Sequence, residues 1–159
     1  MNKILYYLLV FSLLGLLGCD YKPVLSKKNY KFSINVKEIS GDEKINSIII
    51  NHFNNLKGNE KKYYINLSSK KEKKIISKDS KGDPSIFELE INVNYNLEED
   101  GEIIIKKNIN RKTTYNNITD KFELENYENS IIDNISQNIS DRIIFSVSEI
   151  DKWLLNLLR

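Results

Sequence analysis

Residues 87–97 read Phe-Glu-Leu-Glu-Ile-Asn-Val-Asn-Tyr-Asn-Leu, and this stretch decides the fold because apolar and polar residues alternate along its whole length. Successive side chains of a strand point to opposite faces, so the stretch predicts a strand with one buried and one solvated face. The run Glu98-Glu99-Asp100-Gly101 follows it and predicts a hairpin into another strand over residues 103–115. We expect these strands to belong to an antiparallel meander.

Two further strands are predicted on the N-terminal side of this hairpin. Residues 30–39 alternate in the same way and end before Gly41. Residues 62–69 alternate as well, and Ile75 and Ile76 extend this strand as an edge strand. The run from Ser77 to Pro84 is dense in turn-forming residues and predicts the connection to the strand over residues 87–97.

Apolar residues at helical spacing predict two helices. The first begins after the acids Asp42 and Glu43 and ends before Gly58, and the second begins near Asp120 and continues to about residue 157. Its last turns around Trp153 either pack on the domain or project as a contact patch. The predicted fold class is therefore α+β, with two helices packed on one face of a four-stranded mixed sheet in the order β-α-β-β-β-α. The expected core positions of the second helix are Ile132, Ile135, Ile139, Ile143, Val147, Ile150, Leu154 and Leu157.

The N-terminus has the features of a bacterial lipoprotein signal. An apolar run over residues 4–17 follows Lys3, and Gly18 and Cys19 close it. This run of about 14 residues is short for a bilayer span, which needs about 20. A cysteine after the cleavage site can carry two or three acyl chains, palmitate among them, and these anchor a protein to a membrane. A plain secreted protein with an incidental cysteine is the alternative. We predict a signal peptide over residues 1–18, lipidation of Cys19, a tether over residues 19–29 and one domain over residues 30–159.

Composition argues against several classes of function. Loss of Lys3 with the signal leaves 23 basic and 22 acidic side chains, a balance that argues against nucleic acid as a partner. The only cysteine is the predicted lipidation site, and the only histidine, His52, has no obvious partner. The sequence contains no metal-ligand cluster and no nucleophile elbow, so we expect no enzyme, no metal and no cofactor. The acids from Glu98 to Glu102 are interpreted as a solvated charge run on a hairpin turn.

A basic run is the candidate ligand-binding segment. Lysines there outnumber Glu72 and Asp79, and Arg111 on the strand over residues 103–115 could add a bidentate contact to a phosphate. The alternative is that these lysines only protect an edge strand from aggregation. The lysines of the run are Lys70, Lys71, Lys73, Lys74, Lys78 and Lys81.

Several stretches together resemble one family, the LptE lipoproteins of lipopolysaccharide assembly. Residues 19–25, Cys-Asp-Tyr-Lys-Pro-Val-Leu, are similar to the start of alphaproteobacterial members. The element order also agrees, as do the Gly82 turn that leads into residues 87–95, the stretch over residues 110–115 and the long final helix. The resemblance covers nearly the whole mature chain.

This resemblance implies a role without catalysis. LptE proteins sit inside the outer-membrane β-barrel protein LptD, plug its lumen, assist its assembly and bind lipopolysaccharide. The resemblance thus implies an outer-membrane lipoprotein on the periplasmic side, with an LptD-type barrel and lipopolysaccharide as partners. Asp20 departs from the glycine common at this position and leaves retention in the inner membrane open. A lipoprotein subunit of a lipid-transporting ABC system is the alternative function.

Overall fold

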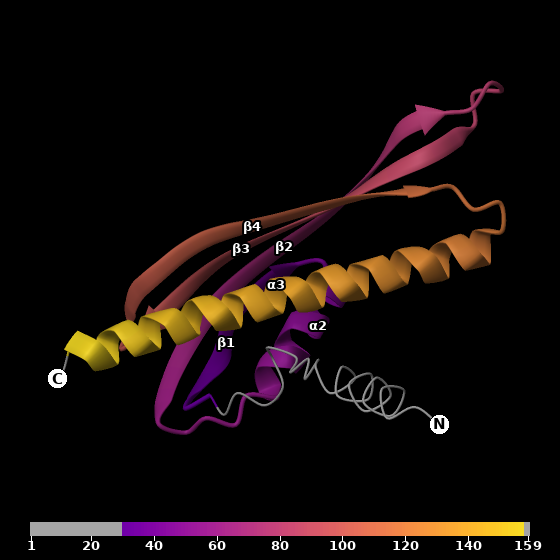
Figure 1. Cartoon of the computed structure of the whole chain (residues 1–159). Helices are drawn as coiled ribbons and strands as arrows, with labels where there is room; N and C mark the ends of the chain where they lie inside the picture. The colour runs from indigo at the N-terminus through magenta and orange to yellow at the C-terminus, as the bar shows by residue number, and fades with distance from the viewer. Residues whose placement is uncertain (1–29, 158–159) are drawn as a thin grey trace, which may run out of the picture.

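A four-stranded mixed sheet carries both helices on one face, as the sequence predicts (Figure 1). The computed structural model describes residues 30–157, so the predicted signal peptide, Cys19 and the tether lie outside the described residues. Neither described helix is long and apolar enough to span a membrane. The elements in chain order are β1 (Phe32–Gly41), α2 (Glu43–Asn54), β2 (Lys61–Lys78), β3 (Pro84–Glu99), β4 (Glu102–Asn116) and α3 (Lys121–Leu157).

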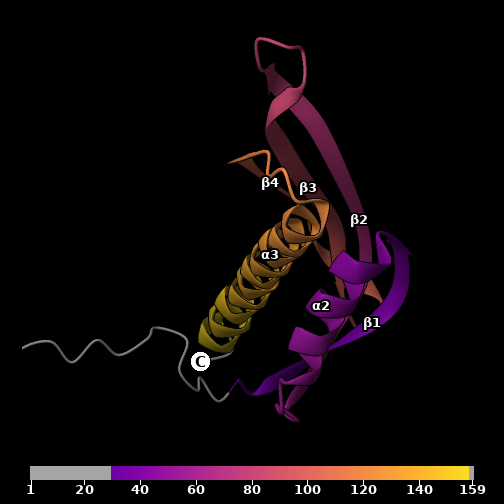
Figure 2. The same ribbon diagram turned by 90° about the vertical axis from the view of Figure 1, so that its right-hand side faces the viewer.

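The strands lie in the sheet in their chain order, β1-β2-β3-β4. β1 and β2 are parallel and are connected through α2, whereas the two later pairs are antiparallel hairpins. The predicted strand over residues 62–69 and its extension form one strand of 18 residues, β2. Figure 2 shows α2 and α3 side by side on the same face of the sheet, where Lys44 Nζ donates to Asn129 Oδ1 at 2.8 Å.

The core lies between this face and the two helices. Every apolar residue of the stretch over residues 87–97 is buried, which confirms the predicted orientation of β3. On α3 the buried positions include Ile132, Ile139, Ile143 and Val147, whereas the predicted core residues Ile135 and Ile150 are half-buried and pack against the core. The side chains of Leu154 and Leu157, also predicted for the core, lie outside the described residues. Ser136, next to Ile135, is fully buried. The largest fully buried side chains are Tyr63, Tyr95, Phe32, Phe53, Ile45, Ile49, Ile65, Leu89, Ile91, Leu97, Ile139 and Ile143.

A sharp bend between β1 and α2 requires glycine. Gly41 has φ +97°, and a Cβ atom there would lie 1.8 Å from the carbonyl oxygen of Ser69. The next residue, Asp42, donates its N–H to that oxygen at 3.3 Å, and its Oδ1 accepts from the N–H of Ile45 at 3.1 Å. The same bend therefore ends β1, caps the N-terminus of α2 and holds both against the middle of β2.

The molecule has two distinct ends, which Figure 1 shows at the lower left and the upper right. We call the first the tether end, because the described chain enters β1 there at Phe32. This end also contains the turn after Glu99 and Trp153, the last described side chain of α3. We call the second the hairpin end, because it contains the β2–β3 turn over residues 79–83 and the start of α3. At 1.5 Å per residue, α3 extends about 55 Å between the two ends.

Polar side chains on the open face of the sheet bond to one another across the strands. Asn110 Nδ2 donates to Glu90 Oε1 at 2.6 Å, and Lys74 and Lys112 reach Glu90 Oε2 at 3.3 Å and 3.0 Å. The hydrogen bond from Asn110, together with the bonds from the two lysines, lowers the pKa of Glu90 to about 2. The Glu90 carboxylate thus ties β2, β3 and β4 together on the face opposite the helices.

Truncation of the core should separate the buried positions from the half-buried one. We expect Ile91→Ala and Ile139→Ala each to reduce the free energy of unfolding by about 2–4 kcal/mol, through lost burial and a residual cavity. Ile135→Ala should cost less, because Ile135 is only half-buried. Denaturant unfolding measures these changes, with Ile76→Ala on an exposed site as the control. A change below about 0.5 kcal/mol at both Ile91 and Ile139 would contradict the assigned core.

Acid should weaken the fold partly through Glu90. The pKa of Glu90 is lower in the folded chain than its ordinary value of 4.5, so its contribution is complete above that pH and is lost as the pH falls toward 2. We expect Glu90→Gln to lower the unfolding temperature at pH 6, and this deficit to shrink toward pH 2.5. Glu102→Gln is the matched control, because Glu102 forms no ion pair among residues 30–157. A deficit for Glu90→Gln that does not change with pH would argue against this role.

Candidate ligand-binding surface

All six lysines of the predicted basic run lie on the outer part of the β2–β3 hairpin. β1 pairs with β2 only as far as Ser69, so from Lys70 to Lys78 the strand β2 is an edge, with β3 as its one neighbour in the sheet. Figure 1 shows this part of the hairpin extending beyond the helices to the β2–β3 turn. The predicted edge-strand position is therefore correct for the lysines from Lys70 to Lys78, whereas Lys81 lies in the turn.

Two of the lysines point to the helix face and are used by the fold. Lys71 Nζ lies 3.1 Å from Asp42 Oδ2, so it pairs with the residue that caps α2. Lys73 forms an ion pair with Glu128 of α3, and its Nζ lies 4.2 Å from the centre of the Phe87 ring. Both ammonium groups face an acidic or aromatic partner, so a ligand would have to compete with these contacts.

Two more lysines lie on the open face among acidic side chains. Lys70 Nζ lies 2.5 Å from Glu72 Oε1, and Lys74 Nζ lies 3.3 Å from both Glu72 and Glu90. The hydrogen bonds from Lys70 and Lys74 lower the pKa of Glu72, and the bonds that Lys74 donates raise the pKa of Lys74. These pairs are exposed, so the two lysines remain accessible to a ligand with a denser negative charge.

Lys78 and Lys81 are exposed lysines of the run at the β2–β3 turn. Asp79 Oδ1 accepts from the N–H groups of Lys81 and Asp83, each at 2.9 Å, and this fixes the turn. Neither lysine side chain forms an ion pair within residues 30–157. We therefore regard these two residues as the part of the predicted set that is best placed to bind a phosphate.

Arg111 lies apart from the lysines of the turn. Arg111 lies on β4 directly opposite Ile91 of β3, so its side chain is on the helix face of the sheet, beneath α3. Its Nε donates to Asn138 Oδ1 at 3.4 Å and one terminal nitrogen donates to the Asn110 carbonyl oxygen at 3.2 Å. The other terminal nitrogen is buried and has no partner in the structure. The seven predicted residues are thus divided among the helix face, the open face and the β2–β3 turn, with Arg111 on the helix face, and they do not meet in one pocket.

The hairpin end also contains an open groove that the sequence analysis did not identify. The groove has a volume of about 790 Å³ and lies between the β2–β3 turn, the segment after β4 and the first turns of α3. Its wall contains two lysines and four acids, and Phe87 and Leu124 contribute apolar surface. The charged residues of the wall are Lys73, Lys121, Asp79, Asp83, Glu125 and Glu128. No local pattern predicts this groove, because three segments distant in sequence form it.

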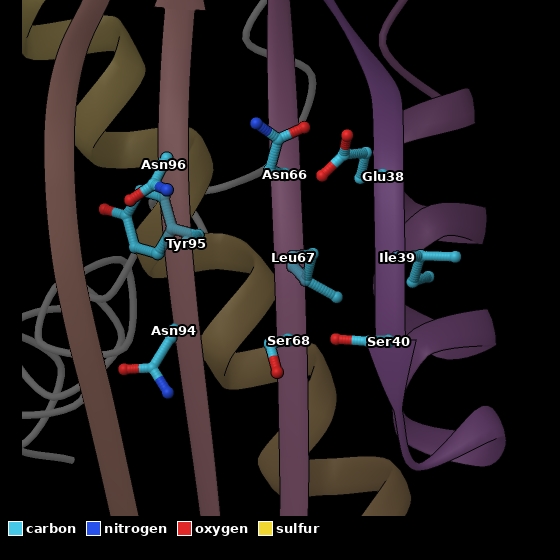
Figure 3. Close-up of a pocket in the computed structure, with 9 residues that line it drawn as sticks. All are labelled: Glu38, Ile39, Ser40, Asn66, Leu67, Ser68, Asn94, Tyr95 and Asn96. Carbon is cyan, nitrogen blue, oxygen red and sulfur yellow. The ribbon is translucent and has the colours of Figure 1, made fainter.

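A second hollow lies on the open face of the sheet, with a volume of about 550 Å³. Figure 3 shows its polar side chains, which come from β1, β2 and β3. Asn66 Nδ2 donates to Glu98 Oε1 at 2.8 Å, and Lys37 donates to Oε2 of the same carboxylate at 2.8 Å. The hollow is therefore a polar surface fixed by hydrogen bonds. Its polar lining consists of Glu38, Ser40, Asn66, Ser68, Asn94 and Asn96.

His52 has a partner that the sequence did not reveal. Its Nε2 lies 3.6 Å from Asp141 Oδ1, so the two side chains meet between α2 and α3. Its Nδ1 is buried without a hydrogen bond in the structure. Within residues 30–157 no three histidine, cysteine or acidic side chains gather in a geometry that could hold a metal ion.

Comparisons with known proteins support the fold. No protein-family model and no curated protein matches the chain. Rare lipoprotein B from Shewanella oneidensis has a similar structure, with a TM-score of 0.57 and 15% sequence identity over 76% of this chain and 98% of that chain. A lipoprotein B from Nitrosomonas europaea has a TM-score of 0.56 and 14% identity, over 80% of this chain and 91% of that chain. The chain therefore shares its fold with proteins that are described as lipoproteins.

Proposed function

We propose that this chain is a lipid-anchored outer-membrane protein that plugs an LptD-type β-barrel, assists its assembly and binds lipopolysaccharide. The observation that carries the proposal is the fold, which matches rare lipoprotein B over 98% of that protein's length. The Gly18-Cys19 pair after an apolar run adds an independent sequence argument for the lipid anchor. Together they favour a tethered domain that acts through its surfaces.

The open face of the sheet suits a plug. The lumen of a membrane β-barrel is polar, so a domain inside it must present polar groups that satisfy one another or the wall. Asn108 Nδ2 donates to the Oδ1 atoms of Asn92 and Asn94 at 2.6 Å and 2.7 Å, beside the Glu90 contacts. This face is therefore polar, hydrogen-bonded and free of helices, as the wall of a polar lumen requires.

The hairpin end suits the lipopolysaccharide. Lipid A carries phosphate groups, and Lys78 and Lys81 present ammonium groups that form no ion pair among residues 30–157, although Asp79 and Asp83 lie in the same turn. The adjacent groove adds Lys121 and the apolar side chains of Phe87 and Leu124. A ligand that carries phosphates next to acyl chains would meet both kinds of surface at this end.

Charge reversal at the turn tests the ligand. We expect Lys78→Glu with Lys81→Glu to weaken lipopolysaccharide binding several-fold and to flatten its salt dependence, because contacts between exposed charges are screened by salt. Thermal unfolding should stay nearly unchanged. Lys62→Glu with Lys106→Glu is the matched control, since these exposed lysines lie toward the tether end and form no ion pair among the described residues. Equal binding by both variants would remove the turn from the proposed site.

The same reversal at Lys71 and Lys73 should have a different result. These lysines pair with Asp42 and Glu128, so Lys71→Glu with Lys73→Glu should lower the unfolding temperature as well as any binding. Thermal unfolding by circular dichroism measures this difference. An unchanged unfolding temperature would show that both lysines are free for a ligand.

The barrel partner is tested in cells. We expect the affinity-tagged protein to copurify with an LptD-type barrel in equal amounts, and depletion of the protein to leave that barrel unassembled. The heat-modifiable migration of the barrel on gels reports its assembly. A fully assembled barrel in depleted cells would contradict the proposed role.

The lipid anchor is tested separately. Cys19→Ala, which removes the predicted anchor, should abolish labelling with a palmitate analogue.

A further inference from the structure

Large apolar side chains are exposed at the tether end on two neighbouring elements. Trp153 and Phe145 of α3 are 62% and 55% exposed, and Ile103 and Ile104 at the start of β4 are 47% and 37% exposed. Single exposed apolar residues are ordinary, whereas several at one end of a domain mark a contact surface. Ile103 pairs with Glu98, whose carboxylate bonds Asn66 on the open face, so the four residues are distributed over both faces of this end. We call these four residues the tether-end patch.

Contacts along α3 place the two parts of this patch at the same level. Lys107 Nζ lies 3.5 Å from Ser146 Oγ, and Tyr115 OH donates to a Glu128 carboxylate at 2.8 Å, so α3 runs antiparallel to β4. From Ser146 to Trp153 the helix advances about 10 Å. From Lys107 back to Ile104 the strand advances about 10 Å as well. Trp153 and Ile104 therefore lie at the same height.

The chain enters the domain at this end. The ring of Tyr30 lies 5.2 Å from Phe32, the ring of Phe32 lies 5.7 Å from Tyr63, and Tyr63 OH lies 3.3 Å from Asp151 Oδ1. Asp151 precedes Trp153 by two residues. A continuous series of contacts thus connects the first described residue to the last turns of α3.

The length of chain before Tyr30 limits how far this end can move from a lipid on Cys19. Ten residues lie between Cys19 and Tyr30, and this stretch, fully extended, reaches at most about 40 Å. Such a short tether raises the local concentration of lipid at the patch to a level at which weak contacts suffice. The hairpin end lies about 55 Å further along α3 and gains much less from the tether.

We propose that the tether-end patch packs against the surface of the membrane that holds the lipid on Cys19. This inference rests on the lipid anchor that forms part of the proposed function. Tryptophan favours the interface between lipid and water, where its apolar ring and its N–H group are both satisfied, and the isoleucines next to it supply apolar area. The tether end would then be held at the membrane, with Lys78 and Lys81 at the far end of the domain.

The charges around the patch favour lipid contact that does not depend on anionic lipid. Lys152 Nζ pairs with Glu149 at 3.1 Å and Lys61 Nζ pairs with Glu99 at 2.6 Å. Lys62, Lys106 and Lys107 form no ion pair among residues 30–157, and the equally unpaired acids Asp100, Glu102 and Asp151 oppose their charge. Because the charges at this end nearly cancel, apolar burial has to supply most of the contact.

The composition of the chain allows a direct test. Trp153 is the only tryptophan, so fluorescence reports on the patch alone. The lipidated protein is reconstituted into phosphatidylcholine vesicles whose acyl chains carry bromine. We expect the emission of Trp153 to move to shorter wavelength and to fall roughly twofold relative to unbrominated vesicles, as for an interfacial tryptophan. Added anionic lipid and moderate salt should change this little.

Variants separate this patch from other exposed apolar residues. Ile103→Asn with Ile104→Asn should reduce quenching by the brominated lipid, whereas Ile75→Asn with Ile76→Asn at the hairpin end should leave it unchanged. Trp153→Phe with Ile76→Trp moves the probe to the hairpin end, where aqueous iodide and not brominated lipid should quench it. Thermal unfolding of each variant shows whether the substitution has disrupted the fold. The quenching of Trp153 in the protein without substitutions tests the proposal even if a variant fails to fold.

A second arm keeps this test independent of the proposed anchor. The chain from Cys19 onward has one thiol, which can be coupled to a maleimide lipid in the same vesicles even if cells do not lipidate it. Trp153 that remains open to iodide and insensitive to brominated lipid in the coupled protein would overturn the docking proposal, whatever the barrel experiments show. Protection of Trp153 from iodide that rises with protein concentration in the absence of lipid would assign the patch to a contact with a second copy. Protection that requires added barrel would assign the patch to the barrel. Either result would also overturn the docking proposal.

Discussion

Ser69 holds the bend between β1 and α2 through three hydrogen bonds, and the positions of the other elements depend on this contact. The Asp42 N–H donates to the carbonyl oxygen and to Oγ of Ser69, and Ser69 Oγ donates to the Asp42 carbonyl oxygen. Gly41 is needed because any side chain would collide with the same carbonyl. The contact fixes the residue at which β1 ends. It also places the N-terminus of α2 at the middle of β2, so that the helix runs back across the sheet.

This early stop of β1 divides the sheet into two regions with different roles. Where β1 is present, β2 is an inner strand and its alternate residues Tyr63, Ile65 and Leu67 are fully covered by the helices. Beyond Ser69 the strand is an edge, where lysines discourage pairing with another chain. Lys71 and Lys73 also bind acids of α2 and α3, so the basic run helps to hold the helices as well as to protect the edge.

The sequence predicted elements well where one local period dominates and poorly where the outcome depends on distant partners. Alternation over residues 87–97 predicted β3 because sheet burial selects every second residue. On α3 the apolar Ile135 was expected in the core, yet the small Ser136 is fully buried and Ile135 is half-buried, since the helix face is set by packing across its whole length. The partners of Lys73 and His52 could not be predicted, because Glu128 and Asp141 become neighbours only once α3 is placed.

The same dependence explains why a basic run in a sequence is weak evidence for a strong anionic site. Lys70, Lys71, Lys73 and Lys74 all have acidic neighbours in the fold, so their charge is largely compensated before any ligand arrives. Each exposed pair contributes only about 0–1 kcal/mol, and a ligand must exchange these contacts to gain new ones. Affinity for an amphipathic anion would then come from Lys78 and Lys81, which form no ion pair among the described residues, together with apolar contact in the adjacent groove. The salt dependence of binding would therefore be shallower than six lysines suggest.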